Sequence, residues 1–144
     1  MVTVVAAAVQ YLKRAFPVQD KGLDQKASPE WVQALEMPSV PIVLSLLRGL
    51  ARGHLVTQQY LDNEGILELL HCLEGVPGEN EIGAKAENLL DTLADKDGKG
   101  EGFLPEKIAR LRNSTRDEMR RRALRRREEL LEVKHYLCFN LFVE

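Results

Sequence analysis

Apolar positions recur at steps of three and four residues along almost the whole chain, and no segment alternates apolar and polar residues over the length of a strand. This spacing predicts helices throughout. Proline, glycine and capping side chains separate each apolar stripe from the next, which places the helix ends in the polar stretches between stripes. The pattern therefore predicts an all-α fold of short helices, followed by one long charged helix.

The first two helices are predicted from one stripe and one cap. A stripe near the N-terminus predicts a helix that ends before Pro17, because a residue that precedes proline disfavours α geometry. Residues 17–27 read as a polar connector. Ser28 is then expected to be an N-cap, with Pro29 in the first turn of a short helix that carries Trp31. The stripe of the first helix consists of Val4, Val5, Ala8, Val9, Leu12, Ala15 and Phe16.

Residues 40–51 are expected to form the central helix of the core. Ser39 and Pro41 repeat the capping pattern of the preceding helix, so Ser39 is the predicted N-cap. Apolar side chains lie almost all round this helix, which is typical of a buried element. Its expected inner face consists of Val43, Leu46, Leu47 and Leu50, with Val40 and Leu44 nearby.

Three further helices are expected between residues 53 and 94. Gly53 predicts the end of the central helix, and Thr57 is the expected N-cap of a short helix after it. Two apolar stripes then flank the turn at 75–78, which predicts a helical hairpin. Stacked hairpins of this kind predict an armadillo-like arrangement. The two stripes are Ile66, Leu67, Leu69, Leu70 and Leu73, and then Ile82, Ala86, Leu89, Leu90 and Leu93.

The polar loop 95–102 partly matches an EF-hand calcium loop. Asp95, Asp97, Gly100 and Glu106 occupy positions one, three, six and twelve of that pattern. However, Lys99 places a positive charge at position five, where an oxygen ligand is required. We therefore interpret the loop as a solvated turn between helices.

The last part of the chain is predicted to contain a long, largely polar helix. A helix beginning at Pro105 is expected to be interrupted at residues 113–114. Thr115 and Glu118 have the spacing of a capping box, which predicts a new helix that continues to Leu131. Its apolar positions are sparse, so most of its circumference is expected to face water or a partner.

Charge is distributed unevenly along the 144 residues. The formal net charge is −2, yet residues 107–127 carry ten basic and two acidic side chains, which leaves a net charge of −10 on the rest. This basic helix is the candidate partner-binding site. Three interpretations stay open: a solvated helix paired with acidic neighbours, a docking face for an acidic protein or calmodulin, and a nucleic-acid surface. The last is the least favoured, because no aromatic residues lie among the arginines. The candidate residues are Arg120, Arg121, Arg122, Arg125, Arg126 and Arg127.

The sequence predicts no metal, cofactor or catalytic site. Cys72 and Cys138 are the two cysteines, and His135 with Cys138 forms an isolated HxxC, whereas tetrahedral zinc needs four converging ligands. No GxSxG nucleophile motif is present. Two cysteines suit a reducing, cytoplasmic setting. No apolar run approaches the roughly 20 residues that span a bilayer, so no membrane span is expected.

Long strings of this sequence resemble one family. The strings are EWVQALEMPSVP (30–41), LARGHLVTQQYLDNEG (50–65), VPGENEIGAKAENLLDTL (76–93) and TRDEMRR (115–121). They are similar to a segment near the C-terminus of the giant calossin-type E3 ubiquitin ligases, whose plant member is an auxin-transport protein. The resemblance covers residues 31–131. It implies a helical module that stands before a half-RING zinc domain and helps to engage a ubiquitin-conjugating enzyme.

The end of the chain departs from that family. The resemblance implies a zinc domain after the arginine-rich helix, but the sequence continues as EVKHYLCFNLFVE, so no zinc ligand is assigned to His135 or Cys138. We expect an N-terminal helix and connector at 1–27, the helical module at 28–131 and a divergent apolar tail at 132–144. The chain is expected to be a truncated fragment that acts as a non-catalytic interaction module. The alternative is a free-standing helical adaptor or calmodulin-binding protein.

Overall fold

The computed structural model describes the backbone of residues 2–17, 28–78 and 80–143, and the side chains of residues 3–17, 28–78 and 80–136. Within these ranges the secondary structure is helical and contains no strand, which confirms the all-α prediction. The chain forms two compact units, Met1–Ala109 and Arg110–Glu144. The first unit contains the packed core, and the second contains most of the last helix.

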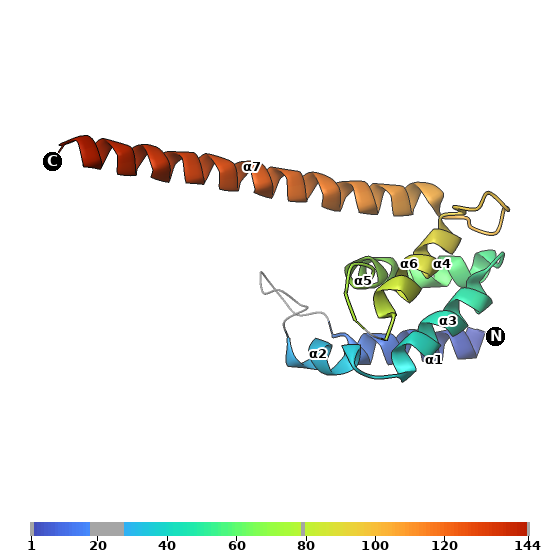
Figure 1. Ribbon diagram of the computed structural model, residues 1–144. Helices are drawn as coiled ribbons and strands as arrows, with labels where there is room; N and C mark the ends of the chain where they lie inside the picture. The colour runs from blue at the N-terminus through green and yellow to red at the C-terminus, as the bar shows by residue number, and fades with distance from the viewer. Residues whose placement is uncertain (1, 18–27, 79, 144) are drawn as a thin grey trace. The chain divides into compact units, whose positions relative to one another are not determined.

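One helix, α3, is central to the first unit. It packs against α1, α4 and α6, while α5 packs against α4 and α6 (Figure 1). The contact between α5 and α6 confirms the predicted hairpin, and all ten apolar residues of its two stripes are buried. The helices are α1 (Val2–Ala15), α2 (Pro29–Leu35), α3 (Ser39–Ala51), α4 (Leu55–Asn63), α5 (Ile66–Leu73), α6 (Ile82–Leu93) and α7 (Pro105–Val143).

The corner between α1 and α2 is built around Trp31. Ser28 caps α2 as predicted, because its hydroxyl accepts a hydrogen bond from the backbone N–H of Trp31. The Trp31 ring is fully buried and meets Phe16 edge to face, with ring centroids 5.0 Å apart. Its indole N–H donates to the carbonyl of Pro17 at 2.9 Å. The Trp31 side chain therefore connects the end of α1 to α2. The rest of the predicted connector, residues 18–27, lies outside the described residues.

The buried face of α3 differs from the predicted one. The residues that enter the core are Val40, Leu44, Leu47 and Ala51, whereas Leu46 is 45% exposed. Val43 and Leu50 are half-buried. Because apolar residues surround this helix, its periodicity does not distinguish the inner face from the outer one. In α1, Val4 is likewise exposed rather than part of the buried stripe.

Two caps predicted within the first unit were wrong. Ser39 lies inside α3 with Pro38 at the N-cap, and its hydroxyl is hydrogen-bonded to the hydroxyl of Tyr11 instead of to the backbone. In α4 the N-cap is His54, whose Nδ1 accepts the backbone N–H of Thr57 at 3.2 Å. An imidazole nitrogen replaces the expected hydroxyl, so α4 begins two residues before Thr57.

The last helix is continuous through the expected interruption. Residues 113–114 are helical, and Thr115 lies in the middle of α7 instead of at an N-cap. Its hydroxyl donates to the carbonyl of Leu111 at 3.3 Å, one turn earlier. This bond satisfies the polar side chain within the helix and replaces the predicted capping box.

Membrane-spanning potential is limited to one bent pair of helices. Among the described residues, no single helix is both long and apolar enough to cross a bilayer. Helices α2 and α3 pass that test only together, by length and composition, and a bend of 73° separates them.

Candidate functional site

The candidate site lies on α7, in the second unit. We call Arg120, Arg121, Arg122, Arg125, Arg126 and Arg127 the arginine cluster. Every side chain from Arg116 to Tyr136 is exposed. Within the described part of the chain, only Arg122 of this cluster has an ion pair, at 3.3 Å from Glu118 one turn earlier. The structure therefore leaves five arginines of the cluster available to a partner.

The arginine cluster does not form one patch. At 100° per residue, its members surround most of the helix, because they occur in two runs of three. Arginines four residues apart, such as Arg121 and Arg125, are neighbours on the helix surface and repel each other. Among the described residues, one carboxylate, that of Glu118, forms an ion pair with the cluster, and that pair is largely exposed. The cluster is thus a strongly electropositive surface on a regular helix.

The loop that resembled a calcium site is held by the protein's own backbone. The Asp95 carboxylate accepts N–H groups from Gly100 and Glu101 at 3.1 Å and from Gly102 at 3.4 Å. These three bonds close the loop around the Asp95 carboxylate. No group of three or more His, Cys, Asp or Glu residues that could hold a metal ion occurs among the described residues. The loop thus has a structural role, as a turn between α6 and α7.

Sequence reasoning missed a buried glutamine that fixes this loop. Gln58 of α4 is fully buried, and its amide nitrogen donates to the carbonyls of Ala51 at 2.8 Å and Glu101 at 2.7 Å. Its amide oxygen accepts the N–H of Phe103 at 2.8 Å. One side chain therefore joins the end of α3, the 95–102 loop and Phe103, which lies between that loop and α7. No local pattern reveals these partners, because two of the three lie more than 40 residues away in the sequence.

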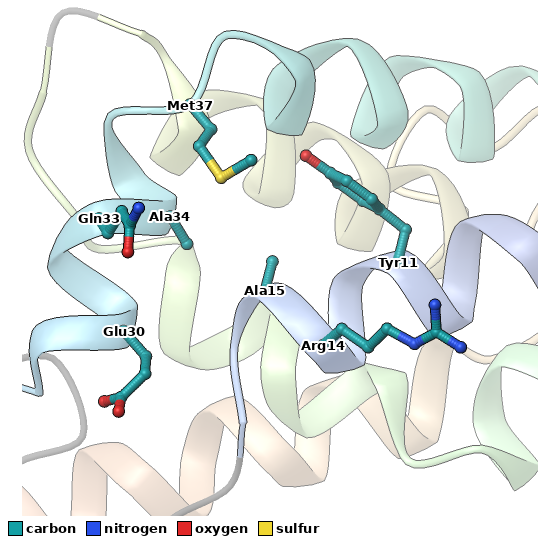
Figure 2. A pocket seen from close by; sticks show the side chains of 7 residues that line it. All are labelled: Tyr11, Arg14, Ala15, Glu30, Gln33, Ala34 and Met37. Atoms are coloured by element: carbon teal, nitrogen blue, oxygen red, sulfur yellow. The ribbon is translucent and has the colours of Figure 1, made fainter.

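A small open cavity lies between parts of α1 and α2. Its volume is about 340 Å³, near the lower end for ligand pockets. Figure 2 shows the methyl groups of Ala15 and Ala34 directed into it, while Arg14 and Glu30 extend away from each other at its edges. Ligand sites need polar groups that converge, and these do not. The arginine cluster remains the stronger candidate.

The histidine and cysteine residues are not brought together by the described structure. His71 Nδ1 lies 2.7 Å from a carboxylate oxygen of Glu74, and Cys72 is half-buried on the same helix. The side chain of Cys138 lies outside the described ranges, and His135 is exposed.

Comparisons with known proteins match most of the chain. The family model for the E3 ubiquitin-protein ligase UBR4 TPR-like domain matches residues 2–114. The auxin transport protein BIG of rice is 57% identical over 129 residues. A probable E3 ubiquitin-protein ligase of Dictyostelium discoideum is 34% identical over 134 residues, and the protein purity of essence of Drosophila pseudoobscura is 28% identical over 130 residues. No solved structure matches the chain.

These relatives are far longer than the chain. The alignments cover 90% of this chain in each case, but only 3% of the rice protein and 2% of the other two. The family match begins in α1 and extends into α7. The division at residues 27/28 and 131/132 and the armadillo-like arrangement stay predictions.

Proposed function

Because the chain belongs over residues 2–114 to the UBR4 TPR-like domain family, we propose that it is a non-catalytic interaction module of a calossin-type ubiquitin ligase. Two of its relatives support this role: the rice auxin transport protein BIG, which fits the resemblance to the plant member of the calossin-type ligases, and a Dictyostelium protein named as a probable E3 ubiquitin-protein ligase. The packed unit up to Ala109 would be a scaffold, and α7 would present the arginine cluster. We propose that the chain performs this interaction role in the cytoplasm.

The proposed partner is an acidic surface of a ubiquitin-conjugating enzyme. The observation that carries this proposal is the exposure of the arginine cluster, in which five members have no ion pair within the described residues. Exposed charges contribute little to folding, at most about 1 kcal/mol per ion pair. They do accelerate encounter with an oppositely charged surface, because long-range attraction steers diffusion. The cluster would therefore act mainly on the association rate.

Neutralising the arginine cluster is expected to slow partner association. Changing all six arginines to Gln should lower the association rate with an acidic conjugating enzyme by about tenfold at low salt, with little change in melting temperature. Changing the same six residues to Lys keeps the charge and is the matched control, which should retain most of the rate. Biolayer interferometry against a panel of conjugating enzymes, at low and physiological salt, measures both variants. Equal rates for the wild-type chain and the Gln variant would contradict the proposal.

Ubiquitin transfer by the chain alone is expected to stay at background. The resemblance places the zinc half-RING outside the helical module, and we propose no catalytic residue in this chain. Discharge of a ubiquitin-loaded conjugating enzyme onto free lysine, followed on a gel, should therefore be the same with and without the chain. Fusion to the half-RING domain of a relative should accelerate it. If the chain alone accelerated discharge as much as the fusion, the non-catalytic role would be wrong.

A second candidate function is that of a free-standing calmodulin-binding adaptor. Met119, Leu124 and Leu131 are all exposed on α7 beside the arginines. A basic helix with apolar anchors is typical of calmodulin targets. Calcium-dependent capture on immobilised calmodulin, reversed by a calcium chelator, would favour this function over the first.

A further inference from the structure

A narrow apolar seam runs along α7 through the arginine cluster. Met119, Ala123, Leu130 and Val133 are exposed, and together with Arg126 they are spaced at steps of four, three, four and three. Steps of this kind keep side chains on one side of a helix and are the repeat by which one helix packs along another. The seam thus consists of four apolar side chains with one arginine at its centre.

Charged residues border this seam asymmetrically. One flank consists of Arg120, Arg127 and Lys134, and none of them has an ion pair within the described residues. The opposite flank has Arg122, already paired with Glu118, and Glu129. The seam therefore has one wholly basic border and one mixed border.

The back of the helix holds the remaining arginines. At 100° per residue, Arg121 and Arg125 lie on the side away from the seam. The arginine cluster is thereby divided into residues that border or interrupt the seam and residues that do not.

A second copy of this chain does not fit the seam. In a parallel pair, seam positions meet their own copies, so the Arg126 side chain would be buried against the same guanidinium of the second copy. In an antiparallel pair, each flank faces its own counterpart, which would place the basic flank of Arg120, Arg127 and Lys134 against itself. Like charges held in contact are destabilising. Charge therefore opposes self-association in both orientations.

We propose that the seam is the docking site of an acidic amphipathic helix on a partner protein, an inference that rests on the proposed function. Carboxylates of that helix lie opposite Arg120, Arg127 and Lys134, and its apolar side chains cover Met119, Ala123, Leu130 and Val133. One acidic or amide side chain meets Arg126 within the seam.

Arg126 sets the register of this pairing. A guanidinium at a seam position is costly when it is desolvated without a partner, and a matching acceptor removes that cost. A helix that is shifted by one heptad places an apolar residue there instead. The arginine thus selects one alignment, in the manner of single polar residues in coiled coils.

A pair of designed peptides tests the proposal on the full chain. The acidic peptide has about four heptads with Leu at the seam positions, one central Glu among them and Glu on both flanks; the basic peptide carries Lys wherever the acidic one has Glu. Fluorescence anisotropy of each labelled peptide measures binding near physiological salt. We expect the chain to bind the acidic peptide and not the basic one. Sedimentation equilibrium of the chain alone should show a monomer, and a dimer would overturn the argument against self-pairing.

Two double variants with the same change in net charge locate the contact. Arg120→Glu with Arg127→Glu should weaken binding of the acidic peptide by tenfold or more, to about the level of the basic peptide with the wild-type chain, and should create binding of the basic peptide. Arg121→Glu with Arg125→Glu, on the back of the helix, should change binding less than about threefold. Circular dichroism checks that both variants keep their helix content.

The outcomes separate this inference from the proposed function. Equal losses in the two double variants would show attraction to net charge alone, which overturns the seam but leaves the arginine cluster as a docking element. Loss of rate in the six-fold Gln variant, without any difference between the double variants, would lead to the same conclusion. Unchanged association in the six-fold Gln variant would refute the proposed function itself.

Discussion

Gln58→Glu is expected to lower the free energy of unfolding by about 3 kcal/mol at neutral pH. The amide nitrogen of Gln58 donates to the carbonyls of Ala51 and Glu101. A carboxylate would place an oxygen where both carbonyls need a donor, in a site with no exposed surface. The α3 end and the 95–102 loop would lose their common anchor.

The pH dependence and a neighbouring residue make this prediction specific. Burial raises the pKa of the introduced carboxyl above its ordinary value of about 4.3, so the part of the penalty that comes from its charge is absent below that pH and grows as the pH rises above it. The protonated carboxyl has one O–H donor for two carbonyls, so a smaller loss of stability remains at low pH. Gln59→Glu, at the adjacent exposed position, should change stability by less than about 0.5 kcal/mol. Urea unfolding of both variants is followed by circular dichroism at about pH 4 and at about pH 7. These two values lie roughly on either side of the titration of the introduced carboxyl. Similar urea unfolding midpoints for the two variants at neutral pH would show that the hydrogen bonds of the Gln58 side chain do not stabilise the fold.

Gly102→Ala is expected to destabilise the first unit by about 3 kcal/mol through a clash with backbone atoms. A Cβ at this position would lie 2.2 Å from the carbonyl oxygen of Thr92 and 2.4 Å from the backbone nitrogen of Asp95. Neither atom can move without disturbing the end of α6. The three N–H bonds to the Asp95 carboxylate would be strained as well, because Gly102 donates one of them.

Gly49→Ala is the matched control, with the opposite sign. Gly49 lies on the exposed side of α3, and a Cβ there meets nothing within 4 Å. Alanine is the better helix former, so this change should stabilise the chain by up to about 1 kcal/mol. Thermal melts of the two variants should therefore shift in opposite directions. A Gly102→Ala chain that melts with the wild type would contradict the close approach of α6 and the loop.

Local patterns predicted those parts of the fold that depend on neighbours in sequence. The stripes of α5 and α6 and the Ser28 cap were confirmed, because each is encoded within a few residues. The inner face of α3 was predicted wrongly, since Leu46 and Leu47 are equally apolar and only the packing of α1, α4 and α6 distinguishes them. Thr115 satisfies a capping pattern in sequence, yet a bond to Leu111 is available within a continuous helix.

The candidate site divides in the same way. The exposure of the arginine cluster follows from its composition, because six arginines within eight positions cannot be buried. The anchoring role of Gln58 does not follow, since nothing near it in sequence distinguishes it from Gln59. A buried amide is recognised only when its distant partners, Glu101 and Phe103, are placed beside it.

The repulsion within the arginine cluster has a consequence for the helix that carries it. Arg121 with Arg125 and Arg122 with Arg126 are like-charged neighbours one turn apart, and each such pair opposes helix formation by a few tenths of a kcal/mol. An acidic partner that neutralises these charges removes that opposition. Partner binding and helix formation in this segment are therefore thermodynamically linked. The free energy of binding includes the change in helix stability of the segment that the partner contacts.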